Sequence, residues 1–167
     1  MENITRYILM FLALMALQIF ILNNVSAIGM TAPYLYIAFI LMLPINLSPT
    51  FVLFLAFCVG IIEDLSIGSL GVHSCATVTM AAMRPTILRI MSPRGGYERF
   101  NVPLMKSFGI MWALKYVLAC VFIHHIVLYF CFSFSLEDAS FLFVRMLINV
   151  CLTAFLILLS QFFIFKK

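Results

Sequence analysis

The sequence predicts an all-α, polytopic integral membrane protein, with about six transmembrane helices in one compact bundle. Composition is the first reason: 65% of the 167 residues are hydrophobic, only 10% are charged, and the mean hydropathy is +1.19. Soluble domains are roughly half apolar and about a quarter charged. At about 20 residues per transmembrane helix, the chain has room for six or seven spans and little else. We therefore expect a single transmembrane domain over residues 1–167, without a sizeable water-soluble catalytic, receptor or nucleic-acid-binding domain.

The second reason is a series of apolar runs separated by polar or turn-forming residues. The third run is too short to cross a bilayer before Glu63 and Asp64, unless these acids lie within the membrane. A polar stretch at about 91–103 contains proline and glycine and predicts a loop. The six predicted spans cover residues 7–22, 34–47, 51–62, 70–90, 104–130 and 139–165.

The third reason is the distribution of basic residues, which also predicts the orientation. If six spans alternate, seven basic residues fall on one side, while the opposite loops (23–32, 65–69 and 132–138) carry no Lys or Arg. Basic residues accumulate on the cytoplasmic side of membrane proteins. We therefore expect both termini and the 91–103 loop to be cytoplasmic, and the net charge of +4 does not indicate DNA binding. The seven are Arg6, Arg89, Arg94, Arg99, Lys106, Lys166 and Lys167.

Polar side chains inside the predicted spans need partners, because ionisable groups in lipid are costly and mark function or helix–helix adhesion. At ~1.5 Å per residue, Asp64 lies ~22 Å along the third span and Arg145 lies ~9 Å below the outer surface, so the two share a depth. A buried pair between them is one hypothesis. The alternative is that Arg145 snorkels and Asp64 caps a helix. The candidate intramembrane polar network comprises Glu63, Asp64, His73, Arg84, Lys115, Arg145 and Asn149.

Helical spacing predicts that two polar stripes face the bundle interior. His73, Thr77 and Arg84 share one helical face, and Arg145, Asn149, Thr153 and Ser160 share another. Such stripes act as interhelical hydrogen-bonding surfaces or as ligand sites. We expect Lys115 near the midplane of its helix, snorkelling or facing a partner, and His124-His125 near an interface.

Tests for an enzyme fail. Gly68-Ser69 precedes His73 without the further glycine and the spacing of a rhomboid-like serine protease. Asp138 lies in a predicted loop, so Asp64 lacks the second membrane-level aspartate of an aspartyl signal peptidase. The five cysteines form no C-x-x-C pair and behave as small hydrophobes. We expect no catalysis, no cofactor and no metal.

The acid pair lies among glycines, which predicts close packing or irregular backbone over residues 60–73. The order Gly60-Ile61-Ile62-Glu63-Asp64-Leu65 and then Leu70-Gly71-Val72-His73 resembles the MreD family of rod shape-determining proteins. Arg84-Pro85, a basic Pro-Arg-x-Gly-Tyr-Glu loop at 93–98, His124-His125 and the terminal Lys-Lys are also similar, so the resemblance covers nearly the whole chain. Glu63 beside Asp64 departs from the family pattern and leaves open which acid acts.

This resemblance implies a non-catalytic, multi-pass component of the elongasome in the bacterial inner membrane, which supports lateral peptidoglycan synthesis and cell shape. Its implied partners, besides the lipid bilayer, are MreC-like, RodA-like and class B penicillin-binding proteins and the MreB-based machinery. On this reading we expect Arg89, Arg94, Arg99 and Lys106 to contact partners or anionic lipid headgroups.

The family is also similar in fold to the substrate-binding subunits of energy-coupling-factor transporters. An alternative function is therefore that of a vitamin-uptake subunit. Such subunits usually carry a small-residue Ala-x-x-x-Ala face on the first helix. Here Ala13 and Ala16 are three residues apart.

Overall fold

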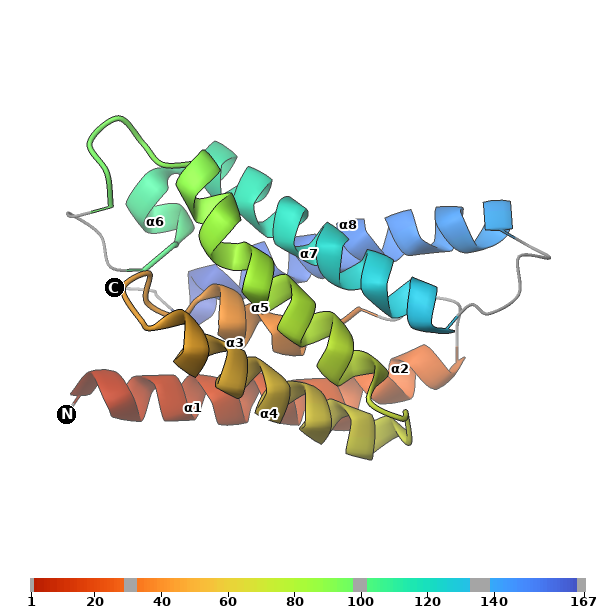
Figure 1. The fold of residues 1–167 in the computed structure, drawn as a ribbon. Helices are drawn as coiled ribbons and strands as arrows, with labels where there is room; N and C mark the ends of the chain where they lie inside the picture. Colours follow the sequence, from red (N-terminus) through yellow and green to blue (C-terminus); the bar gives the residue numbers. More distant parts are fainter. Residues whose placement is uncertain (1, 29–32, 98–101, 133–138, 165–167) are drawn as a thin grey trace.

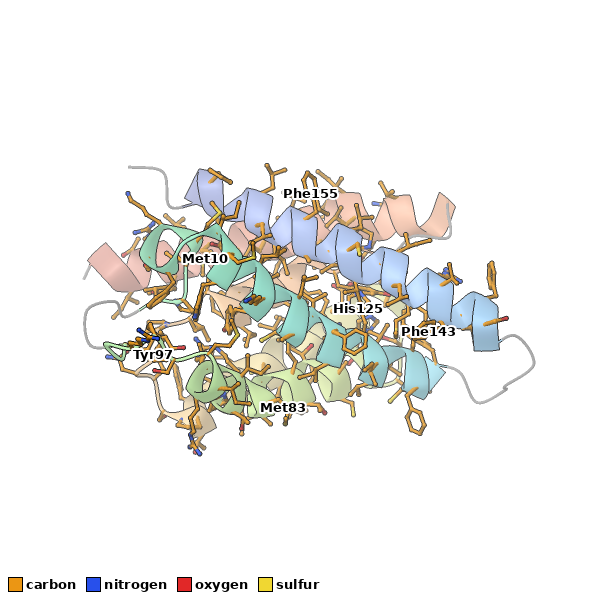
Figure 2. The ribbon with its side chains drawn as sticks, turned by 90° about the horizontal axis from the view of Figure 1, so that it is seen from above. Met10, Met83, Tyr97, His125, Phe143 and Phe155 are labelled. Atoms are coloured by element: carbon orange, nitrogen blue, oxygen red, sulfur yellow. The ribbon has the colours of Figure 1, made fainter. Side chains whose placement is uncertain are left out.

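The computed structural model describes residues 2–28, 33–97, 102–132 and 139–164. Within these ranges the regular structure is entirely helical, as predicted, and the long helices lie side by side along one bundle (Figure 1). Large apolar side chains, such as Phe155 at 62% exposure, cover the outside, whereas His125 lies within the bundle (Figure 2). This distribution suits a molecule whose surroundings are apolar.

Among the described residues, four helices are long and apolar enough to cross a membrane. The first comprises α1 (Glu2–Leu17), a π-helical turn η1 (Gln18–Leu22) and α2 (Asn23–Ile28). The others are α4 (Pro49–Ile67), α7 (Ile110–Phe132) and α8 (Ala139–Ile164). A fifth long helix, α5 (Val72–Ile90), has the same 19-residue length as α4 but a more polar sequence, and Pro85 lies inside it.

The predicted span at 34–47 is not a long helix. It forms a 3₁₀ turn, η2 (Leu35–Ile37), and one turn of α-helix, α3 (Ala38–Leu41), between Pro33 and Pro44. At about 1.5 Å per residue, this short helix is far shorter than a ~30 Å hydrocarbon core. It lies inside the bundle and leads the chain back from α2 toward the beginning of α4 (Figure 1). Every residue from 34 to 43 is buried.

The predicted fifth span also begins later than expected. Residues 105–108 form a separate turn, α6 (Met105–Phe108), and Gly109 follows with φ of +85°, a conformation that ends the turn. The membrane-length helix α7 therefore starts at Ile110. Lys115 is five residues from that start, about 8 Å along the axis, so it lies near one end of α7 rather than near its midplane, and its side chain is exposed.

The first residues of α1, the last residues of α8 and the described part of the basic loop (91–97) lie at the same end of the bundle (Figure 1). Ser48 starts α4 at this end by accepting a 3.4 Å hydrogen bond from the Phe51 amide, and Pro49 occupies the first helical position. We call this the termini end and the opposite one the hairpin end.

At the hairpin end a tight connection joins α4 to α5. Gly68 (φ +72°) ends α4 and Gly71 (φ +81°) precedes α5, both in the left-handed region that glycine adopts at little cost. About two turns earlier, Gly60 lets the two helices touch: a Cβ there would collide with the Cα of Ser74 and lie 2.8 Å from the Ser74 backbone nitrogen. The expectation of close packing or irregular backbone over residues 60–73 is confirmed, because packing is close at Gly60 and the backbone is irregular at Gly68 and Gly71.

We predict that Gly60→Ala separates α4 from α5 and lowers the free energy of unfolding by at least the roughly 1–3 kcal/mol typical of overpacking, because the obstacle is backbone. Thermal unfolding in detergent, followed by circular dichroism, measures this. Gly95→Ala is the matched control, since nothing lies within 4 Å of a Cβ at Gly95. Equal stability of the two variants would contradict the close approach.

Candidate functional site

The short buried helix is held at its first residues by Gln18, on the π-helical turn of the first helix. The Gln18 Oε1 accepts hydrogen bonds from the amides of Leu35 (2.7 Å) and Tyr36 (3.3 Å). Its Nε2 donates to the Pro33 carbonyl (3.3 Å) and to Asn23 Oδ1 (2.8 Å). Gln18 is fully buried. One side-chain amide thus satisfies backbone groups that a helix start leaves unpaired.

The last residues of this segment are held by Arg84 of α5. The Arg84 Nη2 donates to the carbonyls of Leu43 and Pro44, and its Nε donates to the Tyr116 hydroxyl at 3.0 Å. That hydroxyl in turn donates to the Leu41 carbonyl at 3.1 Å. A cation suits the carbonyl end of a helix, where the dipole is negative. Arg84, only 3% exposed, therefore has carbonyl partners, and no carboxylate of the described residues pairs with it.

Side chains from three further positions, Thr77, His124 and Thr153, also contact the first part of the segment. The Tyr36 hydroxyl lies 2.8 Å from His124 Nε2 on α7 and 3.2 Å from Thr77 Oγ1 on α5. The Tyr34 amide donates to Thr153 Oγ1 on α8 at 3.1 Å. Together with Gln18 and Arg84, these contacts connect the short helix to the first helix and to α5, α7 and α8.

Asp64 is the cap of α5. Its carboxylate accepts hydrogen bonds from the amides of His73 and Ser74 (both 2.9 Å) and from the hydroxyls of Ser69 and Ser74 (both 2.5 Å). His73 Nδ1 lies 3.3 Å from its Oδ1. These partners come from α5 and the turn before it, not from Arg145, which is half-buried on α8. The pairing predicted from depth is therefore wrong, and the capping alternative describes Asp64.

Glu63 has different neighbours from Asp64, although both are buried. The Gln18 Nε2 lies 3.5 Å from Glu63 Oε1, and the Ser66 hydroxyl donates to the Glu63 carbonyl at 2.8 Å and lies 3.5 Å from its Oε2. Glu63 thus supports the amide that caps the short helix, whereas Asp64 caps α5. The two adjacent acids stabilise two different elements.

Three histidines surround the ring of Tyr34 in the core. The ring centroids of His73, His124 and His125 lie 5.1, 5.9 and 5.5 Å from that of Tyr34. All three histidines are fully buried within the bundle, including the His124-His125 pair that was expected near an interface. One ring nitrogen of each lacks a hydrogen-bond partner: Nε2 of His73, Nδ1 of His124 and Nε2 of His125. No group of His, Cys, Asp and Glu among the described residues is arranged to hold a metal ion.

The predicted polar network is therefore divided rather than continuous. Glu63, Asp64 and His73 lie together near the hairpin end, and Arg84 lies beyond the other end of the short helix. Asn149 is buried and donates to the Tyr129 hydroxyl at 2.5 Å. Lys115 faces outward. Of the predicted loop contacts, Arg89, Arg94 and Lys106 are exposed, and Arg99 lies outside the described residues.

Gln18 is the residue of this site that the sequence analysis did not single out. In the sequence, Gln18 stands out only as a single amide side chain inside an otherwise apolar first helix. Its role depends on the irregular segment at 34–43, which hydropathy does not reveal. No protein-family model, curated protein or solved structure matches this chain. The resemblance to the MreD family therefore rests on the residues quoted for it.

We predict that Gln18→Leu, which keeps the side-chain bulk, destabilises the fold by about 1–3 kcal/mol for each backbone group that it leaves unpaired. Unfolding at increasing concentrations of a denaturing detergent, monitored by circular dichroism, measures the loss in free energy of unfolding. Asn24→Ala is the control, because Asn24 is exposed and donates only to the Phe20 carbonyl of its own helix. A Gln18→Leu variant as stable as the control would show that the cap contributes nothing.

Proposed function

We propose that this chain is a non-catalytic component of the bacterial elongasome, which supports lateral peptidoglycan synthesis from the inner membrane. The proposal rests on one observation, which is that the residues that carry the resemblance lie together in one part of the structure. Gly60, Asp64, Leu70-Gly71 and His73 occur in the order typical of the MreD family, and all of them belong to the single α4–α5 hairpin. Gly60 allows the contact, Asp64 caps α5, and Gly71 provides the turn.

The use of the buried polar groups also supports a scaffold. Gln18, Asp64 and Arg84 have their hydrogen bonds within the protein, mostly with backbone groups and hydroxyls. The outer faces of the helices carry many exposed apolar side chains, as lipid surroundings require. Partners of this proposal are MreC-like, RodA-like and class B penicillin-binding proteins, and the MreB-based machinery.

The proposed orientation places the termini end in the cytoplasm. Arg89, Arg94 and Lys106 lie on the segments at that end, which agrees with the accumulation of basic residues on the cytoplasmic side. In this orientation the loop that carries these side chains meets the cytoplasmic machinery or the headgroups of the inner leaflet. The hairpin end then faces the periplasm.

A vitamin-uptake subunit is the second candidate, and one cavity favours it. A cavity of about 610 Å³ opens at the hairpin end between the 68–72 turn, Cys75 and residues 130–132. Its volume lies in the range of small-molecule sites. Ala13 and Ala16 are both exposed on α1, where a transporter partner would dock.

Depletion of the protein in its own bacterium tests the proposal. We expect cells to widen and round up, with loss of wall insertion along the side walls, scored by microscopy with a fluorescent peptidoglycan label. Unchanged width and insertion would overturn the elongasome proposal. A growth defect relieved by excess vitamin would support the uptake subunit instead.

Complementation of the depleted strain then separates the two acids. We expect Asp64→Ala to fail, because it leaves two α5 amides and two hydroxyls without their acceptor. Glu63→Gln should complement, because an amide still pairs with Gln18 and Ser66. Leu65→Ala, at an exposed neighbouring position, is the control, and membrane levels are compared by immunoblot. Full complementation by Asp64→Ala at a normal level would exclude a role for that carboxylate.

A further inference from the structure

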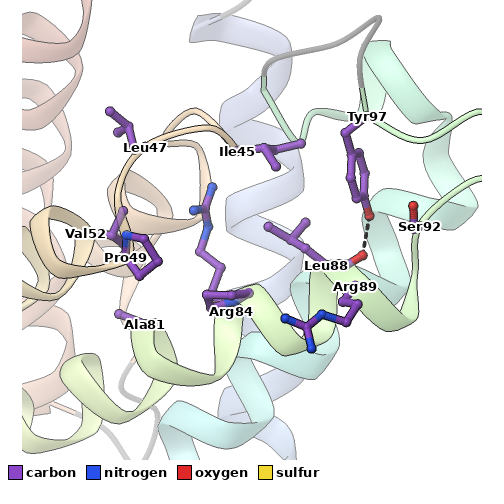
Figure 3. A pocket seen from close by; sticks show the side chains of 11 residues that line it. Ile45, Leu47, Pro49, Val52, Ala81, Arg84, Leu88, Arg89, Ser92 and Tyr97 are labelled. Atoms are coloured by element: carbon purple, nitrogen blue, oxygen red, sulfur yellow. Dashed lines mark hydrogen bonds between the residues drawn. The ribbon is translucent and has the colours of Figure 1, made fainter.

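A second cavity, of about 330 Å³, lies at the termini end of the bundle (Figure 3). It is enclosed by the chain that leaves the short helix, the beginning of α4, the second half of α5 and the loop after α5. The Tyr97 hydroxyl donates to the Leu88 carbonyl at 2.7 Å, which fixes the loop against α5 and forms one wall. The cavity is separate from the one at the hairpin end.

The polar part of this cavity is Arg84. Two of its guanidinium nitrogens, Nε and Nη2, are occupied by the Tyr116 hydroxyl and by carbonyls. No hydrogen bond within the described residues uses the third, Nη1, and Figure 3 shows the guanidinium projecting among Leu47 and Val52. Carbonyl dipoles offset the positive charge only in part. A buried arginine that lines a cavity and has no carboxylate partner is a site for an anion.

The rest of the lining is largely apolar. Ile45, Leu47, Val52 and Leu88 form most of the wall around Arg84, and the hydroxyl of Ser92 and the exposed Arg89 lie at its rim. A fully hydrated inorganic anion gains little from such walls, whereas a molecule with an anionic group joined to hydrocarbon matches both parts. Arg84 is also six residues, about 9 Å, from the last residue of α5.

We propose that this cavity binds the phosphate group of an anionic membrane lipid, with Arg84 Nη1 as the buried donor and Ile45, Leu47, Val52 and Leu88 against the first part of the acyl chain. Arg89 and Ser92 contact the headgroup at the rim. This inference does not rest on the proposed function, because it is argued from the cavity and from Arg84, and not from Gly60, Asp64 or the turn between α4 and α5.

The single tryptophan provides the measurement. Trp112 stacks on Tyr116 (ring centroids 5.2 Å apart) and lies 6.2 Å from the ring of Tyr97, so it is next to both the Arg84 partner and the cavity wall. The full chain is reconstituted in phosphatidylcholine vesicles, and brominated phosphatidylglycerol or brominated phosphatidylcholine is added at rising mole fraction. We expect half-maximal quenching of Trp112 at a several-fold lower mole fraction of the anionic lipid. Equal quenching by the two lipids would overturn the proposal.

Variants test whether the preference for the anionic lipid arises at this cavity. Arg84→Gln should abolish it and Arg84→Lys should retain part of it. Since Arg84 also holds the short helix, Ala81→Leu fills the cavity from α5 without changing any charge and should abolish the preference too. Arg94→Gln removes one charge from the exposed loop outside the cavity and should leave it unchanged. A loss in Arg94→Gln as large as that in Ala81→Leu would indicate general surface attraction and contradict a site.

Inorganic phosphate distinguishes the two sources of the anion. We expect millimolar phosphate, at constant ionic strength, to leave the quenching by brominated phosphatidylglycerol unchanged. Displacement of the lipid by phosphate would assign the cavity to a soluble anion and overturn the lipid assignment.

Discussion

Backbone hydrogen bonding within the bundle is the constraint on which the rest of this structure depends. A helix that crosses a membrane satisfies its own amides and carbonyls, but the segment between Pro33 and Pro44 is too short and too irregular to do so. Every residue of it from 34 to 43 is buried, so water cannot supply the missing partners. The partners must therefore be side chains of other helices. Most of the buried polar residues described above form hydrogen bonds with backbone groups of this segment or of a helix end.

The positions of those side chains follow from the ends of the elements that they satisfy. Gln18 lies on a π-helical turn, an irregularity in the first helix that is often found where a side chain has a specific role. Arg84 reaches carbonyls and Asp64 reaches amides, which matches the sign of each helix end. Helix geometry explains why the two adjacent acids, Glu63 and Asp64, do not form one site. Successive residues on a helix point about 100° apart, so Glu63 and Asp64 face different neighbours.

The sequence was sufficient for the helical class, for α5 and α8, for the middle of α4, and for the close packing at Gly60. It was insufficient where hydropathy cannot distinguish a buried broken helix from a spanning one, as in residues 34–47. Depth arithmetic placed Asp64 beside Arg145, but depth carries no information about azimuth, and the amides of α5 were nearer. Lys115 was misplaced because Gly109 moves the start of α7. The burial of His124-His125 was not expected, because polarity alone cannot reveal that the Tyr36 hydroxyl is a hydrogen-bond partner for His124 inside the bundle.

The way in which the short helix is held has a consequence for biosynthesis. Its first residues depend on Gln18, which the ribosome makes earlier, but its last carbonyls depend on Arg84 and Tyr116, and its Tyr34 amide depends on Thr153. Each polar group left unpaired in hydrocarbon costs several kcal/mol. The segment therefore cannot reach its final place as it leaves the translocon. Its full set of hydrogen bonds can form only after α8, which carries Thr153, has been made.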